Sequence, residues 1–368
     1  MSITTEAAVV ETAGAEFVIQ PVQLGALQPH EVLVDIKAAG LCHTDLSVAG
    51  GGLPFPLPGV LGHEGAGVVS AIGSGVTRVK PGDTVILSFT SCGSCRNCRD
   101  GHPAYCDTWL PANLIGGARM DGTSPISRDG KALGGHFFGQ SSFARQAVVD
   151  ERSAVKVETT LPLEHLAPLA CGVQTGAGAV WNAIQPRPGS SLAVFGVGAV
   201  GLSAIMAAAL SPAVTIIAVD RVASRLELAR ELGATHTIHA AAVQDVPAEI
   251  QRITGGGADA AIEATGHTTV LEQAVFSTAA RGQVVAVGAP AFGATAAVDV
   301  NFIMPGRRVQ GITLGDSEIE TLIPAIVALM EAGRFPVEKL ISTYKLEDVN
   351  KAAEDMKAGT AIKPVMVL

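Results

Sequence analysis

The spacing of hydrophobic residues divides the chain into two regions with different predicted secondary structure. Residues 31–37, 67–72 and 84–87 are short runs rich in aliphatic and β-branched side chains, and glycines and prolines interrupt the sequence between them. Runs of this kind predict short strands that are joined by tight turns. We therefore expect a strand-rich region over residues 1 to about 90.

From residue 191 onward, apolar runs of strand length alternate with Ala- and Leu-rich segments of helical length. Such alternation predicts a doubly wound parallel sheet, here spanning about 176–314. The predicted strands lie at 192–195, 214–219, 258–263, 282–288 and 309–314, and the predicted helices at 202–210, 226–232 and 270–279. The tail predicts helices near 318–332 and 346–356 and a last strand at 363–368, which we expect to pack back on the first region.

Composition and charge narrow the class of protein. A chain of 368 residues is long for one domain and favours two, each able to bury a core. Hydrophobic residues make up 48% of the chain and charged residues 16%, which is typical of a globular protein. The net charge of −9, without any basic run, argues against a nucleic-acid or anionic-membrane partner.

The sequence also predicts a compartment. The N-terminus has no signal-peptide pattern, and the longest apolar run, residues 202–210, is too short to span a bilayer. We therefore expect a cytoplasmic protein. In that compartment the six cysteines are metal ligands or free thiols rather than disulfide partners.

A stretch between two glycine-rich turns offers the side chains that bind a transition metal. It contains Cys42, Asp45, His63 and Glu64. Thiolate and imidazole together favour zinc, and a catalytic zinc takes three protein ligands and leaves a fourth position open. Cys171, a lone cysteine between glycine-rich turns, is the candidate third ligand; the alternative is a buried apolar cysteine, and spacing alone does not choose between them.

The remaining four cysteines, Cys92, Cys95, Cys98 and Cys106, fall within 15 residues. Their spacing lets one loop wrap a tetrahedral ion, which predicts a closed structural zinc site. A pair of disulfides is the alternative, which the expected compartment disfavours. Because sulfur fills all four positions, we expect this ion to hold the loop and to do no chemistry.

A glycine-rich turn predicts dinucleotide binding because it follows a predicted strand and opens a predicted helix. Gly196 permits the turn, Gly198 lets the backbone approach a pyrophosphate, and Gly201 lets the helix pack on the strand. Asp220, 19 residues further on, would accept hydrogen bonds from ribose hydroxyls and repel a 2′-phosphate, which favours NAD over NADP. Arg221 leaves that choice open, because an arginine there could pair with the phosphate.

Four motifs occur in the same order as in the zinc-dependent medium-chain alcohol dehydrogenases. They are Gly62-His63-Glu64, the four-cysteine loop 92–106, the segment that begins at Cys171, and the turn that begins at Gly196. The chain resembles this family over nearly its whole length. Residues 120–124 and 136–139 are similar to the liver-type branch, and the whole chain is most similar to the bacterial aryl-alcohol (benzyl alcohol) dehydrogenases.

The resemblance implies an α/β fold with two domains. A GroES-like, β-rich catalytic domain is formed by residues 1–175 and 315–368 and includes the structural zinc loop. A Rossmann domain with a doubly wound parallel sheet, residues 176–314, is inserted between them and binds NAD. The family further implies one catalytic and one structural zinc per chain and a homo-oligomer, a dimer or a tetramer, with residues 294–300 as the strand that pairs across a dimer.

The resemblance also implies the catalytic roles. Cys42, His63 and Cys171 would hold the catalytic zinc, and Asp45 would orient His63. The hydroxyl of Thr44 would receive the alcohol proton, the alternative being a helix cap. The implied catalytic set is Thr44, Cys42, His63, Cys171, Asp45 and Glu64, where the glutamate approaches the metal transiently when water or product leaves.

The cofactor contacts follow from the same likeness. His43 and Lys363 match positions that hold the pyrophosphate, and Arg225 matches one that approaches the adenosine ribose; an exposed charge is the alternative for each. The positions along the nicotinamide side are Thr175, Val200 and Val287, where the alternative for the valines is core.

One departure affects the proton path. The liver-type relay often ends in a histidine, whereas Ser47 occupies that position here. A hydroxyl is not a base near neutral pH, so His43 or solvent would take that role.

Aromatic side chains on segments that line the pocket in relatives predict the substrate. They are Phe89, Trp109, Phe137 and Phe138. Four rings favour a flat or allylic alcohol such as benzyl alcohol; ordinary core is the alternative. The predicted reaction is reversible oxidation of a primary aromatic or allylic alcohol to its aldehyde with hydride transfer to NAD. The alternatives are a glutathione-dependent formaldehyde dehydrogenase or general primary alcohol dehydrogenase, and, outside enzymes, an NAD/zinc redox sensor.

Overall fold

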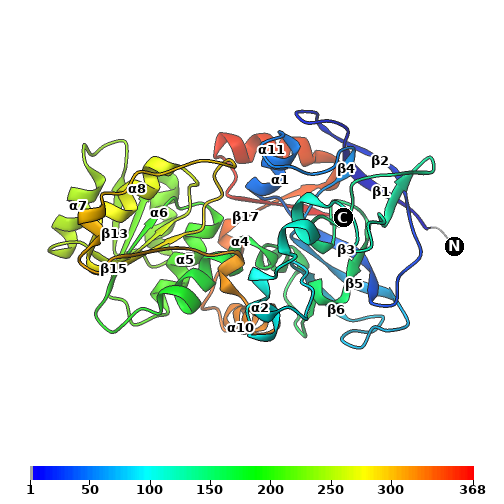
Figure 1. Cartoon of the computed structure of the whole chain (residues 1–368), viewed down its shortest axis with the longest axis horizontal. Helices are drawn as coiled ribbons and strands as arrows, with labels where there is room; N and C mark the ends of the chain where they lie inside the picture. Colours follow the sequence, from blue (N-terminus) through cyan, green and yellow to red (C-terminus); the bar gives the residue numbers. More distant parts are fainter. Residues whose placement is uncertain (1–2) are drawn as a thin grey trace. The chain divides into compact units, whose positions relative to one another are not determined.

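The computed structural model describes residues 3–368, which form two compact units (Figure 1). The first unit runs to Cys171 and resumes at Glu318–Leu368, and the second is Gly172–Ser317. The expected domain limits therefore lie four residues away at one junction (175 against 171) and three at the other (314 against 317). The second unit is inserted into a first unit that both ends of the chain build.

Two sheets form the frame of the first unit. The smaller has the strand order β4-β1-β2-β7-β8, and the larger has the order β10-β6-β5-β3-β18-β17, with β9 also paired to β3. Their bounds are β1 (Ile3–Val10), β2 (Phe17–Leu24), β3 (Glu31–Gly40), β4 (Gly59–Val60), β5 (Gly65–Ile72), β6 (Thr84–Leu87), β7 (Ile126–Arg128), β8 (Lys131–Ala132), β9 (Gln146–Asp150), β10 (Ala154–Lys156), β17 (Ile341–Lys345) and β18 (Lys363–Val367). The three strands predicted in this region are confirmed as β3, β5 and β6.

The last strand of the chain pairs with one of the first. β18 is antiparallel to β3, with Val365 opposite Gly40 and Met366 opposite Ala39. Val365 and Met366 are fully buried, which stabilises the pairing by about 1.5–3 kcal/mol for each side chain. Figure 1 shows this red strand among the blue strands of the N-terminal part, and the prediction that the tail packs back on the first region is confirmed.

The first unit also contains α-helices, most of them short. They are α1 (His43–Ala49), α2 (Arg96–Arg99), α3 (Leu163–Leu166), α10 (Ile319–Glu331) and α11 (Val349–Ala358). In α10, Ile319, Ile323, Ile326 and Met330 are all buried, at the spacing of one helical face. α11 begins later than predicted because Leu346–Asp348 forms a 3₁₀ turn.

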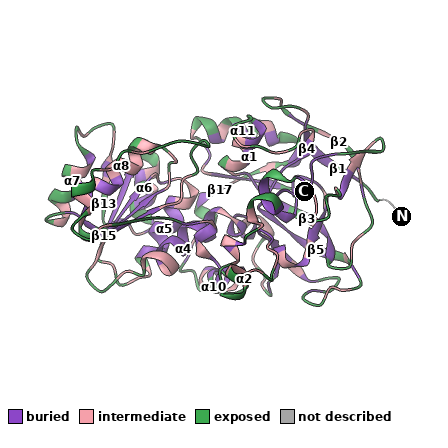
Figure 2. Ribbon diagram, viewed as in Figure 1, coloured by how far each residue is buried: buried purple, intermediate pink, exposed green. Residues whose placement is uncertain are grey.

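The second unit is built on a six-stranded parallel sheet. Its order is β13-β12-β11-β14-β15-β16, so the strand order reverses between β11 and β14. The bounds are β11 (Ser191–Phe195), β12 (Thr215–Asp220), β13 (His236–His239), β14 (Ala258–Glu263), β15 (Thr278–Ala286) and β16 (Arg308–Gly311). The inner strands are almost wholly buried, as in a sheet covered on both faces (Figure 2). The predicted doubly wound sheet is confirmed.

The helices of this unit are α4 (Gly172–Gly178), α5 (Ala199–Ala209), α6 (Ala223–Glu231), α7 (Val246–Thr254), α8 (Thr268–Phe276) and α9 (Val300–Ile303). Within one chain, residues 294–299 form no regular element, and α9 begins at Val300. A strand that pairs across a dimer has its partner in a second copy of the chain, so the pairing expected at 294–300 stays a prediction. The edge of the sheet is β16. No helix formed by residues 3–368 is both long and apolar enough to cross a membrane.

Candidate active site

Side chains from distant parts of the first unit converge in one cluster. Cys42, His63, Glu64 and Cys171 each place one ligand atom so that all four atoms lie within 4.8 Å of one another. The structure thus brings together the three ligands that the sequence predicts for a catalytic zinc. All four residues belong to the first unit, so that unit alone builds the cluster.

Asp45 fixes the two segments that carry Cys42 and His63. Its Oδ2 accepts a hydrogen bond from the Cys42 N–H (2.9 Å), which caps the start of α1. Its Oδ1 accepts from the Gly62 N–H (3.0 Å) and lies 3.0 Å from His63 Nδ1. Because a carboxylate only accepts, Nδ1 carries a proton, and Nε2 is the nitrogen that would bind a metal.

The donor set fits a zinc ion. His63 is 1% exposed, and its Nε2 is buried without a hydrogen-bond partner. A buried polar atom in that state is rare in folded proteins and calls for an explanation such as an ion. One imidazole nitrogen beside two cysteine sulfurs is a ligand set that zinc prefers, with a fourth position left open.

The pKa values of Cys42, His63 and Cys171 depend on one another. A hydrogen bond with Cys171 lowers the pKa of Cys42 well below its usual value, and the same contact raises the pKa of Cys171. Burial lowers the pKa of His63, but the Asp45 carboxylate opposes this and raises it to about 10. The cluster therefore gathers negative charge on the Cys42 sulfur, which favours a cation.

Glu64 lies next to the cluster but is held by another partner. Its Oε1 and Oε2 accept hydrogen bonds from Lys363 Nζ at 2.9 and 2.8 Å, and both side chains are buried. Lys363 also donates to the carbonyl of Leu41 (3.1 Å). Burial raises the pKa of Glu64, although Lys363 lowers it. The predicted contact of Lys363 with a pyrophosphate stays a prediction.

Thr44 lies in the first turn of α1, beside the cluster. Cys42 Sγ and Thr44 Oγ1 lie within hydrogen-bond distance of each other, at 3.8 Å. The helix is capped by Cys42 and Asp45, so the alternative role of Thr44 as the cap does not apply. His43 is exposed at the start of the same helix, and Ser47 is half-buried one turn later.

Three of the four predicted aromatic residues lie at or next to the predicted metal ligand His63. Phe138 stacks on the imidazole ring (centroids 4.5 Å apart), Phe137 meets it edge-on (5.4 Å), and Trp109 meets Phe138 edge-on (5.6 Å). Phe89 and Phe137 are 2% and 0% exposed. For these two rings the structure favours the alternative role of core side chains, while Trp109 remains half-exposed.

The four-cysteine loop also closes on itself. The sulfurs of Cys92, Cys95, Cys98 and Cys106 lie within 4.8 Å of one another. Cys92 Sγ accepts hydrogen bonds from the N–H groups of Ser94 (3.4 Å) and Cys95 (3.3 Å), as a thiolate ligand does. These contacts, the Ser94 N–H first, lower the pKa of Cys92 to about 6. All six cysteines are free thiols, so the alternative of a disulfide pair is wrong.

In the second unit, the glycine turn has the backbone that a dinucleotide requires. Gly196 has a φ of 83°, and a Cβ on Gly201 would overlap the carbonyl oxygen of Gly196. No atom approaches the Cβ position of Gly198 within 4 Å, which leaves room for a pyrophosphate at the start of α5. Asp220 Oδ2 accepts the N–H of Val197 (2.8 Å) and so holds this turn in place. The turn therefore fits a dinucleotide.

Other predicted cofactor residues also lie in the second unit. Thr175 is buried in α4, and Val200 and Val287 are half-buried. Arg225 keeps a buried Nε without a partner. A cavity of about 340 Å³ beside Asp220 is lined by Arg221, Ala240, Val243, Gln244, Asp245, Val246, Pro247, Val270 and Gln273.

Sequence analysis missed two buried polar residues that hold these sites. Glu263, the last residue of β14, is 2% exposed and accepts hydrogen bonds from the N–H groups of Thr265 (2.6 Å) and Gly266 (3.0 Å). An acidic residue at the end of a predicted buried strand was the available signal. Gln140 binds the backbone near His63, and its sequence neighbours gave no signal.

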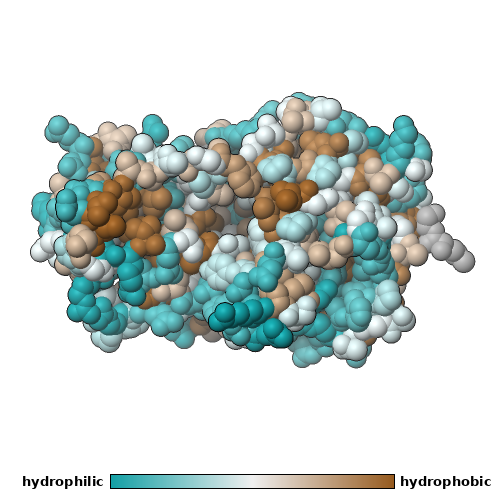
Figure 3. All heavy atoms as spheres, in the orientation of Figure 1, coloured by the Kyte–Doolittle hydropathy of each residue, from teal (hydrophilic) through white to brown (hydrophobic). Residues whose placement is uncertain are grey.

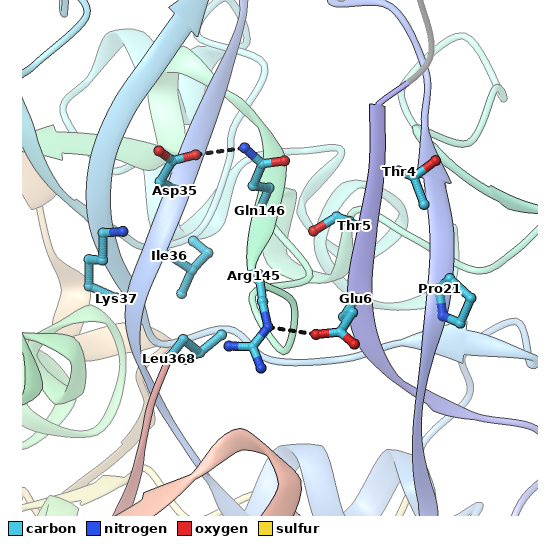
Figure 4. Close-up of a pocket in the computed structure, with 10 residues that line it drawn as sticks. All are labelled: Thr4, Thr5, Glu6, Pro21, Asp35, Ile36, Lys37, Arg145, Gln146 and Leu368. Atoms are coloured by element: carbon cyan, nitrogen blue, oxygen red, sulfur yellow. Dashed lines mark hydrogen bonds and ion pairs between the residues drawn. The ribbon is translucent and has the colours of Figure 1, made fainter.

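A larger cavity, about 560 Å³, lies elsewhere in the first unit (Figure 4). It is lined by Thr4, Thr5, Glu6, Pro21, Asp35, Ile36, Lys37, Arg145, Gln146 and Leu368. Arg145 pairs with Glu6 (2.7 Å), and Gln146 donates to Asp35 (2.7 Å), so its polar side chains largely bind one another. None of the predicted site residues lines this cavity.

Comparison with known proteins agrees with this geometry. Residues 28–159 match the alcohol dehydrogenase GroES-like domain, and residues 199–328 match the zinc-binding dehydrogenase family. A geraniol dehydrogenase from Castellaniella defragrans is 43% identical over 366 residues, covering 99% of this chain and 98% of that one.

Solved structures give the same result over the whole chain. An alcohol dehydrogenase zinc-binding domain protein from Burkholderia ambifaria is 49% identical with a TM-score of 0.97, and all of both chains is covered. Benzyl alcohol dehydrogenase from Acinetobacter calcoaceticus is 43% identical with a TM-score of 0.96, covering 100% of this chain and 99% of that one. The chain therefore belongs to the zinc-dependent medium-chain alcohol dehydrogenases, a family that uses zinc and a nicotinamide cofactor.

Proposed function

We propose that this protein is an NAD-dependent zinc alcohol dehydrogenase that reversibly oxidises a primary aromatic or allylic alcohol, such as benzyl alcohol or geraniol, to its aldehyde. One observation carries the proposal: Cys42, His63 and Cys171 converge with an unpartnered His63 Nε2 among them, and the Thr44 hydroxyl lies beside the Cys42 sulfur. The relatives named for geraniol and benzyl alcohol support the substrate class.

Each residue of the cluster would have its own role in the reaction. Cys42, His63 and Cys171 would hold a zinc ion, which when bound supplies a Lewis acid that lowers the pKa of an alcohol. Asp45 keeps the proton of His63 on Nδ1. The Thr44 hydroxyl would accept the alcohol proton and pass its own proton outward. A nicotinamide cofactor, when bound, would supply the acceptor for the hydride of the carbinol carbon, so that alcohol plus NAD⁺ would give aldehyde, NADH and one released proton.

The proton's path outward from Thr44 runs along α1. Ser47 lies three residues further on the same helix, within reach of Thr44, and His43 is exposed at the start of the helix. A serine hydroxyl passes a proton on only as it receives another, so His43 or solvent would be the final acceptor. His43 would also contact the cofactor pyrophosphate, as would Lys363.

The cofactor would be NAD, held by the glycine turn of the second unit. The Asp220 carboxylate would accept hydrogen bonds from the adenosine ribose and repel a 2′-phosphate. Arg225, with its partnerless Nε, would approach the same ribose, and Arg221 lines the neighbouring cavity. Thr175, Val200 and Val287 would contact the nicotinamide side.

A substrate panel tests the proposal. NADH formation should give a higher kcat/KM for benzyl alcohol or geraniol than for ethanol, and a higher kcat/KM with NAD than with NADP. A preference for ethanol would overturn the aromatic or allylic assignment in favour of a general primary alcohol dehydrogenase. Activity on formaldehyde that requires added glutathione would favour the formaldehyde dehydrogenase. Metal analysis with one zinc per chain and no turnover would favour a redox sensor.

The protein would act as a homo-oligomer in the cytoplasm, where its six thiols stay reduced. β16 is an edge strand whose four residues are all exposed, and an unpaired edge is a template for another strand. Apolar side chains are exposed close to it in sequence: Phe292, Val300, Met304 and Val309. Figure 3 shows hydrophobic atoms gathered on the second unit, at the left of the view. Sedimentation of the wild type as a dimer or tetramer, and of Val309→Lys as a smaller species, would support this assembly.

A further inference from the structure

One buried carboxamide joins the segments that carry the metal ligands. Gln140 is 1% exposed, and its Nε2 donates to the carbonyls of His63 (3.0 Å), Leu87 (2.8 Å) and Ser88 (3.0 Å). Its Oε1 accepts the N–H of Gly65 (3.0 Å). All the partners are main-chain groups, so both amide hydrogens, one of them shared between two carbonyls, are used to hold backbone.

These contacts fix the backbone that follows His63. The carbonyl of His63 and the N–H of Gly65 lie on either side of Glu64, and both bind the same carboxamide. Gly65 and Leu87 are also the last pair of the ladder between β5 and β6. Gln140 therefore continues the hydrogen bonding of that ladder back to His63, which precedes the first residue of β5.

Gln140 is also linked, through Ser88, to the segment that carries Cys171. The carbonyl of Ser88 accepts from Gln140, and the hydroxyl of Ser88 donates to the carbonyl of Ala170 at 2.7 Å. Ala170 directly precedes Cys171 in the chain. A displacement of Gln140 would therefore move the carriers of both His63 and Cys171.

The backbone around Gln140 is kept in an unfavourable conformation. His136, Phe138 and Ser141 have φ values of 65°, 51° and 55°, a region that residues other than glycine rarely occupy. Ser141 Oγ donates to the carbonyl of Val60 (2.7 Å) and accepts the N–H of Phe137 (2.9 Å). Such conformations persist where the surrounding contacts determine them, often at functional sites.

We infer that Gln140 is a positioning residue of the catalytic metal site: its carboxamide holds the backbones that place His63 and Cys171. This role rests on the proposed function only for the reaction that the site performs. Loss of the carboxamide would keep the same ligand side chains, but the backbone segments that carry them would no longer be held together. The first measurable effect is therefore on metal affinity and geometry, and the loss of turnover follows from it.

The test uses the full-length protein with zinc replaced by Co²⁺, whose visible spectrum reports coordination geometry. Gln140→Met keeps the length of the side chain and removes its hydrogen bonds. We expect the catalytic-site affinity for the metal to fall about 10- to 100-fold and the cobalt spectrum to change, while one metal per chain remains in the four-cysteine loop. Gln146→Met is the matched control, because Gln146 donates only to Asp35 in the same unit; it should leave both readouts unchanged.

A wild-type spectrum and wild-type affinity in Gln140→Met would overturn the inference. If that variant does not fold, Gln140→Glu and Ser88→Ala replace it. The glutamate keeps an oxygen for Gly65 but loses the amide donors, and the alanine breaks only the link to Ala170. Each should alter the cobalt spectrum by less than Gln140→Met, and two unchanged spectra would refute the role. The metal readouts need no substrate, so a wild type without alcohol oxidation would overturn the proposed function and leave this test valid.

Discussion

Lys363 Nζ lies 2.8 Å from Glu64 Oε2, so the first residue of the last strand forms an ion pair with the neighbour of a metal ligand 299 residues earlier. The lysine side chain is 2% exposed and the glutamate side chain 0%. A buried pair of this kind contributes little over an apolar pair, but removal of one partner leaves an uncompensated charge. The pair thus connects β18 with the segment that contains His63 and Glu64.

Lys363→Met should lower the free energy of unfolding by about 3–5 kcal/mol, because it removes the cation that pairs with the buried Glu64 carboxylate. The double variant Glu64→Gln, Lys363→Met should recover much of that loss. Urea denaturation of the zinc-loaded protein measures both. Lys351→Met is the control: Lys351 pairs with Asp355 at 3.2 Å but is 66% exposed, so its loss should cost less than about 1 kcal/mol. Equal losses for the two lysines would contradict this account.

Gly40→Ala should disturb the same carboxylate. A Cβ at Gly40 would overlap Glu64 Oε2, which Lys363 holds in place. We expect a lower melting temperature and a smaller zinc content by mass spectrometry. Gly25→Ala is the control, because the nearest atom to its added Cβ is 3.7 Å away. A stable Gly40→Ala protein with two zinc ions per chain would show that the segment adjusts.

Thr44→Ala should keep zinc and NAD binding but lower kcat by a factor of about 100 or more, as expected when a proton-transfer group is lost. The reason is the position of the Thr44 hydroxyl, 3.8 Å from the Cys42 sulfur. Thr44→Ser retains a hydroxyl and should retain most of the turnover. Steady-state kinetics with benzyl alcohol, together with NAD titration, measure these effects. Full activity of Thr44→Ala would remove the residue from the mechanism.

Asp220→Asn and Arg221→Ala should shift cofactor preference in opposite directions. Loss of the Asp220 charge removes repulsion of a 2′-phosphate, so the NAD/NADP ratio of kcat/KM should fall roughly tenfold, which corresponds to about 1.4 kcal/mol. Loss of the Arg221 guanidinium removes a group that could pair with that phosphate, so the ratio should rise. Asparagine keeps one acceptor oxygen, for the Val197 N–H or for the N–H groups of Arg221 and Val222, so NAD affinity is measured beside the ratio to detect any distortion of the turn. An unchanged ratio in both variants would place the choice of cofactor elsewhere.

Glu11 predicts a small acid-dependent term in stability. Hydrogen bonds from Arg128 and Gln20 lower its pKa from 4.5 to about 2. Because the folded pKa is depressed, the contribution is present above pH 4.5 and is lost as the pH falls toward 2. The side chains of Glu11 and Arg128 are 41% and 25% exposed, so the effect on the free energy of unfolding should stay below about 1 kcal/mol.

Melting temperatures measured between about pH 6 and about pH 3 test this expectation. Glu11→Gln should lower the melting temperature at the upper end of this range and converge with the wild type at the lower end. Glu16→Gln, an exposed residue nearby, serves as the control and should follow the wild type throughout. A gap that widens on acidification would contradict the assigned sign.

The sequence predicted those features that local chemistry determines. The turn from Gly196 to Gly201 needs residues without a Cβ, and four cysteines in one loop can reach a common ion without help from the rest of the fold. α7 was not predicted, although Asp245 caps it and a proline follows in its first turn. That helix was within reach of sequence reasoning.

Other features depend on contacts between distant segments. Gln140 binds only backbone groups, and a backbone group carries no sequence signal. A count of aromatic residues near the site could not distinguish rings that line a pocket from rings that pack on His63, as Phe137 and Phe138 do.

The pairing of β18 with β3 has a consequence for the order of events during synthesis. Residues 172–317 form a unit that is complete in itself and can fold as soon as it leaves the ribosome. The N-terminal part emerges earlier, yet its larger sheet lacks an inner strand until residues 363–367 are translated. Lys363, the partner of Glu64, arrives with that strand, so the segment that carries the predicted metal ligand His63 gains this contact only after residues 363–367 have been translated.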